Sequence, residues 1–495
     1  MSGFTIQRLY LLLTAIVLVA VGLFIHQPII GFGISLLLAL FVFYDEKIGI
    51  LFMIIFVPIR PFLTVYNTGF KLIGDMILLL LLVKTFYHNR KNLRELFRFH
   101  PFEYAFFAFL ILGAISALIT GVSLKAIIIQ LRAFGLFYLL FYIIKRMKVS
   151  PQDIKDFSFT TLIFGVVLSV QGLVEKISVR TLFLPEVWQR MELSYTNKQR
   201  IYGLMGGPNE TGMFLLISFL IGFYLLSIRK DKGKGKSLII ASLILIATAF
   251  LLTYSRGALL TVIAFLPVYL VITRRVKFLV PLAIIGITAG ILFFSVEKVT
   301  HVVEKYQIQH AKEINGDQSV DETDNYDEKE VNRFSDAFSA ENRALSNADG
   351  RAYYFKKSLE VLKTSPIIGY GFGTFGGSAT LIYSSPIYKH FGINGNFYSD
   401  NQYTQIIAET GVIGIILLAA FVIFLMKITW DLRKKQDLSP LLIYFIVAAV
   451  VSGAVYNILE MDAFTMYYFI ILGYAIRFIK NRETVCIKKR GDHFH

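Results

Sequence analysis

The chain has 495 residues, of which 55% are hydrophobic and 17% charged, and apolar runs long enough to cross a ~30 Å hydrocarbon core recur along it. This composition predicts an all-α, polytopic helical membrane protein and argues against an outer-membrane barrel, whose strands would alternate in pieces of ~10 residues. The formal charge of +16 is typical of basic cytoplasmic loops rather than of nucleic-acid binding. The one cysteine, Cys486, cannot by itself form a disulfide framework or a thiolate metal site.

The apolar runs predict about fourteen transmembrane helices. The first run has a basic start but no small-residue cleavage pattern, so we expect it to be retained. The third contains Pro58 and Pro61 and is expected to be kinked or partly re-entrant. The predicted spans are, in order, 9–25, 29–43, 48–63, 71–87, 101–120, 124–144, 158–177, 209–228, 237–254, 257–273, 278–295, 407–427, 439–457 and 462–479.

Lys and Arg gather in alternate connections, which sets the orientation. The connections 84–98, 145–155 and 229–236 are densely basic, whereas 120–123 carries no Lys or Arg. Because basic loops stay inside, both termini are predicted to be cytoplasmic in a multi-pass cell-membrane protein. The polar segment 295–401 then lies outside, and a connection of that length is usually functional or disordered.

The chain is predicted to have three parts. Residues 1–194 form the N-terminal transmembrane helices. Residues 195–430 form the core and include the extracytoplasmic loop 296–403. Residues 431–495 form the last helices and a basic tail.

The long loop changes composition along its length. Residues 312–330 are acidic and polar, which favours disorder or a solvated surface. Residues 350–363 predict an amphipathic helix that ends before Pro366. The glycine-rich stretch 369–377 lacks the strand and lysine of a phosphate loop, so we expect no nucleotide donor. No acidic spacing matches a calcium loop either, and we predict neither metal nor cofactor.

Three arginines flank outer segments. Arg256 lies in a short turn between two apolar runs, where it either snorkels at a helix end or holds a phosphate group. Arg351 and Arg200 are each either solvated surface residues or further cations for an anionic lipid head.

Two other residues leave alternatives open within the N-terminal half. Arg132 falls inside a predicted span, so it should face the bundle interior and pair with a carbonyl or an acid such as Glu175. The sequence does not favour a structural over a functional role for this arginine. Trp188, in the outer loop 177–209, is most simply a membrane-interface anchor.

The remaining candidates are polar residues at the outer ends of helices. Asn209 follows a Gly-Gly-Pro turn and is a plausible helix cap. Asp400 is either a base that accepts a proton from an attacking hydroxyl or the cap of the helix that follows it. His390 is a second candidate base in an exposed turn.

Several short motifs occur in a recognisable order over residues 195–425. They are Arg200-Ile201-Tyr202-Gly203 through Pro208-Asn209, Thr253-Tyr254-Ser255-Arg256-Gly257-Ala258, Gly350-Arg351, Gly369-Tyr370-Gly371-Phe372-Gly373, Asp400-Asn401-Gln402-Tyr403 and Glu409-Thr410-Gly411. In order and spacing they resemble those of the O-antigen ligase and O-antigen polymerase superfamily of bacterial membrane proteins.

The resemblance implies a GT-C-like, metal-independent glycosyltransferase that uses undecaprenyl-diphosphate-linked oligosaccharides outside the membrane. Arg256 and Arg351 would hold the diphosphate, and Asp400 stands where ligases usually have a histidine, which favours a polymerase. The size and layout are similar to those of teichuronic acid polymerases. The implied catalytic residues are Asp400, Arg256 and Arg351, and the implied substrate-binding residues are Arg200, Asn209, Tyr370, Asn401 and His390.

The implied function is polymerisation of lipid-linked repeats into a cell-wall or capsular polysaccharide. Expected partners are the lipid-linked oligosaccharide, membrane lipids, and a chain-length regulator and flippase, with no nucleic acid. The alternatives are a ligase that moves a finished glycan, a flippase of lipid-linked oligosaccharides, which Arg132 would favour, and a structural partner of an export complex.

Overall fold

The computed structural model describes residues 6–193, 195–229, 233–315, 350–433 and 438–491, and every regular element within these ranges is a helix. The predicted all-helical membrane architecture is confirmed. Most of the predicted acidic stretch 312–330 lies outside the described residues.

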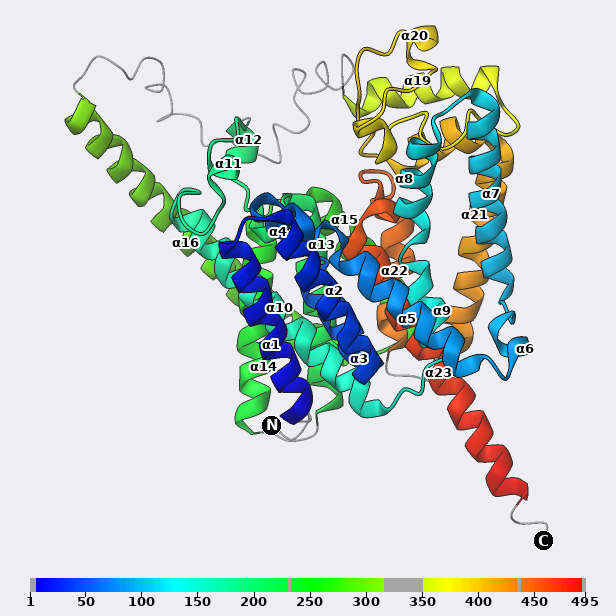
Figure 1. The fold of residues 1–495 in the computed structure, drawn as a ribbon. Helices are drawn as coiled ribbons and strands as arrows, with labels where there is room; N and C mark the ends of the chain where they lie inside the picture. The colour runs from blue at the N-terminus through cyan, green and yellow to red at the C-terminus, as the bar shows by residue number, and fades with distance from the viewer. Residues whose placement is uncertain (1–5, 194, 230–232, 316–349, 434–437, 492–495) are drawn as a thin grey trace.

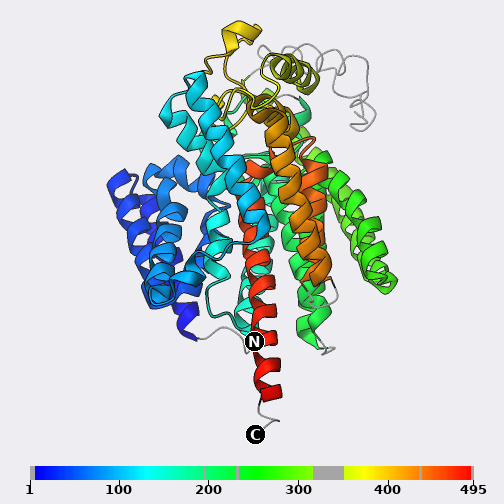
Figure 2. The ribbon, with the colours of Figure 1, turned by 90° about the vertical axis from the view of Figure 1, so that its right-hand side faces the viewer.

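The helices form a bundle with two distinct ends (Figures 1 and 2). Helix α1 (Ile6–Phe24) begins and α23 (Asp462–Gly491) ends at one end, which we call the tail end. The short helices α19 (Arg351–Thr364) and α20 (Tyr388–Phe391) lie at the opposite end, which we call the loop end. The start of α1 and the end of α23 therefore lie at the same end, in agreement with an even number of crossings.

Each predicted span corresponds to a helix or to a bent pair of helices. Of the helices in the described residues, eight are long and apolar enough to cross a membrane, and two bent pairs bring the number to ten. The number fourteen therefore stays a prediction. The elements are α1, α2 (Pro28–Tyr44), α3 (Glu46–Phe56) with α4 (Arg60–Tyr66), α5 (Ile73–Asn89), α7 (Pro101–Thr120), α8 (Leu124–Gly135) with α9 (Tyr138–Ile144), α10 (Pro151–Ile177), α13 (Pro208–Ile228), α14 (Lys234–Leu252), α15 (Arg256–Thr273), α16 (Leu279–Asn315), α21 (Gln402–Leu432), α22 (Ser439–Ser452) and α23.

The third and the eleventh predicted spans differ from simple straight helices that end where the sequence predicts. The predicted kink in the third span is confirmed, since α3 and α4 meet at 77° and Pro61 opens α4. Helix α16 continues to Asn315, well past the predicted span end at 295, and leans away from the bundle in Figure 1.

Helix α23 lies at the centre of the bundle (Figure 2). Every residue from 463 to 475 is buried. Neighbouring helices surround this segment, which explains why it is apolar on all faces. Its first residue, Asp462, is thereby fixed at the loop end.

The glycine-rich stretch is packed against membrane helices and does not form a phosphate-binding loop. The Ser116 hydroxyl of α7 donates to the Gly369 carbonyl (2.8 Å), and the Phe372 amide donates to the Gly113 carbonyl (3.0 Å). Gly371 has φ +90°, and a Cβ there would come within 1.9 Å of the Ala117 nitrogen. Glycine is therefore needed at 371 so that the loop backbone can approach α7 directly.

Two buried carboxylates, Glu409 and Glu460, complete this anchoring. Glu409 of α21 accepts backbone hydrogen bonds from Gly373 (2.8 Å), Thr374 (3.1 Å) and Phe375 (3.2 Å). Gln405 donates to Glu409 (3.2 Å) and also to Glu460 (2.6 Å). Buried N–H groups need acceptors where water is absent, and the carboxylates supply them.

Glu460 binds the next part of the loop. It accepts hydrogen bonds from Gln130 of α8 (2.6 Å) and from the backbone amide of Ser378 (2.8 Å), and the Ser378 hydroxyl bonds to it as well. The loop, α8, α21 and the segment before α23 thus meet in one polar network.

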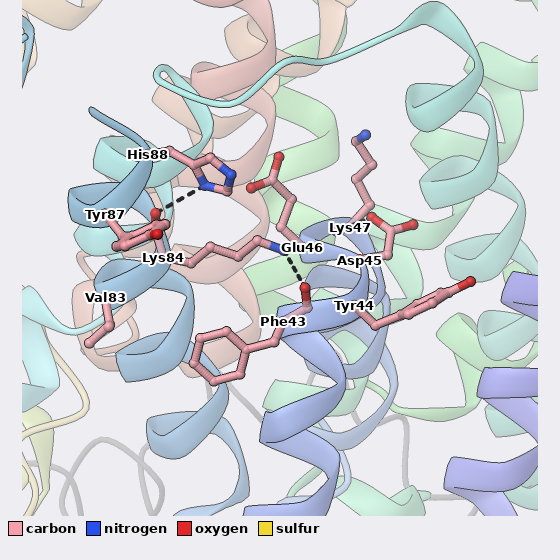
Figure 3. A pocket seen from close by; sticks show the side chains of 9 residues that line it. All are labelled: Phe43, Tyr44, Asp45, Glu46, Lys47, Val83, Lys84, Tyr87 and His88. Carbon is pink, nitrogen blue, oxygen red and sulfur yellow. Dashed lines mark hydrogen bonds between the residues drawn. The ribbon is translucent and has the colours of Figure 1, made fainter. Parts of the chain in front are cut away.

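A groove of about 700 Å³ lies at the tail end, between the last turns of α2 and α5 (Figure 3). Lys84 reaches across it and donates to the carbonyls of Val42 (2.8 Å) and Phe43 (3.0 Å), which have no acceptor role inside α2. The lysine thus ties the two helices together, and the groove is far from the residues predicted to carry chemistry.

We predict that Gly371→Ala destabilises the protein more than Gly395→Ala. Both glycines have positive φ, so each substitution is expected to cost about 1–2 kcal/mol of backbone strain. At Gly395 nothing lies within 4 Å, whereas at Gly371 the new methyl group would also push α7 away. Thermal unfolding in detergent measures the difference, and equal melting temperatures would contradict the packing.

We predict that Glu409→Gln weakens the attachment of the loop and lowers the free energy of unfolding by about 1–3 kcal/mol or more. A neutral amide is a poorer acceptor for three N–H groups, and its NH₂ group would face the NH₂ donor of Gln405. The control is Glu360→Gln, which changes an exposed carboxylate on α19. Limited proteolysis of the purified protein should cut the loop of the Glu409 variant faster, while the control behaves like the parent.

Candidate active site

Arg200 lies at the loop end and hydrogen bonds to two separate segments of the chain. Its Nε donates to the Thr253 carbonyl (2.8 Å) and its Nη2 donates to the Asn209 side-chain oxygen (2.6 Å). Burial lowers the pKa of Arg200, and the nearby charge of Arg256 lowers it further. Arg200 therefore joins the turn before α13 to the turn before α15, and places its charge close to Arg256.

Asn209 does not cap its helix, so that prediction is wrong. Gly207 takes the cap position of α13 and Pro208 opens the helix, because proline has no N–H to satisfy there. The side chain of Asn209 instead accepts from Arg200 and, at 3.4 Å, from the Tyr456 hydroxyl.

Arg256 is the first residue of α15, and its side chain is exposed. Among the described residues its guanidinium has no hydrogen-bond or ion-pair partner. The next residue is glycine because a Cβ at Gly257 would lie 2.5 Å from the Tyr456 hydroxyl oxygen. Ser255 shares a hydrogen bond with that hydroxyl (2.7 Å). The Ser-Arg-Gly turn thus packs on Tyr456 and presents its arginine outward at a helix N-terminus, where anions are favoured.

Arg351 opens α19 and reaches Asp400, with 3.5 Å between Nη2 and Oδ2. Both side chains are about half exposed, at 44% and 48%, so the pair adds little stability and a ligand can compete for it. Partial burial raises the pKa of Asp400 above its usual 3.8, and the charges of Arg351 and then Arg200 oppose that rise.

Asp400 does not cap α21, so the cap interpretation of this residue is wrong. Asn401 is the cap and accepts hydrogen bonds from the amides of Tyr403 (3.0 Å) and Thr404 (3.1 Å). Asp400 instead has φ +47°, a left-handed conformation that aspartate tolerates better than most residues. The buried Asn457 side chain accepts from the Asn401 amide (2.8 Å) and the Ser399 hydroxyl (3.0 Å), which fixes the turn around Asp400.

These residues meet around Tyr456. Burial raises the pKa of Tyr456, and the charges of Arg200 and Arg351 act to lower it, so both arginines lie near its hydroxyl. The turn that carries Arg256 packs against the same hydroxyl. The structure therefore brings Arg200, Arg256, Arg351 and Asp400 together at the loop end.

Two predicted residues lie apart from this group. The Tyr370 hydroxyl donates to Thr364 (3.2 Å) and its ring contacts Phe391, which makes it part of the packing of the loop. His390 is exposed on α20 with its ring against Phe391 (4.8 Å). Their predicted substrate contacts stay predictions.

The acidic partner of Arg132 is not Glu175, which the sequence analysis suggested. Arg132 pairs with Asp75 of α5 through two nitrogens (2.7–3.1 Å), whereas Glu175 binds Arg180 and the amides of Tyr202 and Gly203. Trp188 packs against Phe62 with 6.4 Å between ring centroids.

Tyr456 was not identified as a site residue from the sequence. Tyr456 lies at the end of the predicted apolar span 439–457, and its position in the site becomes visible only where distant segments meet. Among the described residues, no three His, Cys, Asp or Glu side chains could together hold a metal ion.

Residues 241–419 match the O-antigen ligase family. The predicted resemblance is thereby confirmed for this part of the chain, which runs from α14 into α21 and contains Arg256, Arg351 and Asp400. The match supports a glycan ligase- or polymerase-type function in a multi-pass membrane protein, with a lipid-linked glycan as substrate. No curated protein matches the chain.

Proposed function

We propose that this protein polymerises undecaprenyl-diphosphate-linked oligosaccharide repeats into a cell-wall or capsular polysaccharide, such as teichuronic acid, on the outer face of the cell membrane. The observation that carries the proposal is the grouping of three guanidinium groups with one carboxylate at the loop end, in a chain that matches the O-antigen ligase family. Both termini are then cytoplasmic, as the basic loops predict.

The arginines suit the leaving group. When the bond between the anomeric carbon and the phosphate oxygen breaks, the diphosphate keeps the electron pair and its negative charge increases. Guanidinium groups bind phosphate oxygens through paired N–H donors and stabilise that charge. Arg256 and Arg351 make this contact, and Arg200 adds charge from its fixed position behind them.

Asp400 suits the attacking group. A hydroxyl at the non-reducing end of one lipid-linked repeat attacks the anomeric carbon of the chain on the second carrier. Asp400 accepts the hydroxyl proton as the new glycosidic bond forms, and passes it to water afterwards. When the diphosphate draws Arg351 away from the carboxylate, Asp400 becomes a better base, so donor binding prepares it for the proton.

A ligase that transfers a finished glycan to another acceptor is the second candidate, since the matching family is described as an O-antigen ligase. The two differ in what accumulates when the protein is lost. A polymerase leaves single repeats on the lipid carrier, whereas a ligase leaves long polymer there. A chain-length regulator and a flippase are the partners that a polymerase would need.

We predict that Arg256→Ala and Arg351→Ala each reduce polymer formation by about 100-fold or more, the effect of removing a donor to a developing oxyanion. The control is Lys356→Ala, which removes an exposed cation from the same helix, α19. The measurement is the length distribution of lipid-linked glycan in cells that produce each variant. Normal chain lengths in both arginine variants would refute the proposal.

We also predict an acidic limb in the pH profile. Because the pKa of Asp400 is raised, the carboxylate takes up a proton at a higher pH than an ordinary aspartate. The transfer rate should be full near neutral pH and fall as the pH drops through that raised pKa. Asp400→Asn should be slower by about 100-fold and should lose this limb, because no titrating base remains.

Purified protein in liposomes with lipid-linked repeats allows that measurement. Glu360→Gln, which removes a carboxylate on the exposed side of α19, should keep both the rate and the acidic limb. An unchanged pH profile in the Asp400 variant would exclude this residue as the base.

A further inference from the structure

A second group of charged side chains lies next to the arginine site. Arg60, at the start of α4, forms an ion pair with Asp462, at the start of α23. Arg132 binds Asp75 through Nη2 at 2.7 and 2.8 Å and through Nε at 3.1 Å. We call these four side chains the outer charge cluster.

The cluster is formed by four elements and is partly exposed. Asp75 lies in the first turn of α5 and Arg132 in the last turn of α8, and the charge of Asp462 acts on Arg132, so the two ion pairs are neighbours. The four side chains are 22% to 36% exposed. By contrast the Lys145–Glu103 pair, at 7% and 0%, is enclosed as a structural pair would be.

Tyr398 connects the cluster to the arginine site. It lies two residues before Asp400, and its hydroxyl is 3.5 Å from a Glu460 oxygen. Burial raises the pKa of Tyr398 well above its usual value, and the carboxylates of Glu460, Glu210, Asp400 and Asp462 raise it further. Tyr398 therefore stays protonated, and its contact with Glu460, two residues before Asp462, joins the Asp400 turn to the start of α23.

The chemistry of the cluster suits a saccharide better than a second diphosphate. Its two arginines are each neutralised by an aspartate, so the four side chains together carry no net charge. A diphosphate would need uncompensated cations such as Arg256. Guanidinium donors and carboxylate acceptors that are fixed by each other and partly exposed match sugar hydroxyls, which both donate and accept.

Partly exposed ion pairs within apolar helices also require an explanation. Such pairs contribute little stability, while charged residues in membrane segments are costly and usually mark a functional site. The four cluster residues lie outside residues 241–419, so the matching family domain does not account for them.

We infer that the outer charge cluster, with Tyr398, binds the acceptor saccharide and sets which acceptor the protein uses. This inference rests on the proposed function, because it assigns the second substrate of that reaction. The sugar would lie across Arg60, Asp462 and Tyr398 with its terminal hydroxyl directed to Asp400. The N-terminal helices that carry Arg60, Asp75 and Arg132 then supply acceptor specificity, while the family domain supplies the diphosphate site.

The test separates acceptor from donor. Lipid-linked repeats are extracted from cells that lack the protein, and part of this material is released from its lipid by mild acid and labelled at the reducing end. The released repeat keeps its terminal hydroxyl, so it can accept, but without a diphosphate it cannot donate. Full-length protein in liposomes first receives a fixed amount of lipid-linked repeat and increasing amounts of labelled acceptor. In a second series the labelled acceptor is fixed and the lipid-linked repeat is increased.

The variant is Arg60→Gln with Asp462→Asn, which removes one ion pair without changing net charge. We expect the half-saturating concentration of labelled acceptor to rise about tenfold, the loss expected for one polar recognition contact, with that of the lipid-linked donor unchanged. The matched control is Glu186→Gln with Arg190→Gln, a highly exposed ion pair between an arginine and a carboxylate. Arg132→Lys, which keeps the charge but loses the bidentate contact, should give the same shift if the first variant fails to fold.

The outcomes are distinct. An acceptor half-saturation within twofold of the parent, in a variant that melts like the parent, overturns the inference. If Arg256→Ala still abolishes transfer in that experiment, the proposed function stands without it. If Arg256→Ala transfers normally, the proposed function fails and the inference fails with it. An equal rise for acceptor and donor indicates a purely structural ion pair and also overturns the inference.

Discussion

Two buried carboxylates hold the segment 369–378 to the helical bundle, and the site depends on them. Glu409 accepts three backbone N–H groups of the glycine-rich stretch, and Glu460 joins Ser378 to Gln130. Where water is scarce, backbone donors must find acceptors in the protein, and a buried carboxylate must find donors. This mutual need fixes the loop, and through it the Asp400 turn, relative to the helices that carry the arginines.

The three arginines of the site differ in what their donors already bind. Arg200 uses its donors on Thr253 and Asn209, so it acts as a fixed source of positive charge. Arg351 shares a long, half-exposed contact with Asp400, and Arg256 is exposed at a helix start. A ligand with phosphate oxygens would displace little in order to reach the last two. Its binding would also change the surroundings of the carboxylate.

The structure thus suggests a division within the chain. Residues 241–419 carry Arg256, Arg351 and Asp400, and they match a known family. The earlier helices and the start of α23 carry the outer charge cluster. Because α23 is buried from 463 to 475, its first residue is held against α4, and the two parts form one face at the loop end.

The sequence by itself determined the helical membrane architecture, the kink at Pro61 and the motif positions of Arg256, Arg351 and Asp400, because apolar length, proline geometry and short motifs are local properties. Only the tertiary structure decided which side chains cap helices and which form ion pairs. Asn401 rather than Asp400 caps α21, and Asp75 rather than Glu175 pairs with Arg132, since these choices depend on which helix ends meet. Contacts between side chains distant in the sequence, such as Arg132 and Asp75, leave no periodic signal in the chain, so they could not be predicted from it.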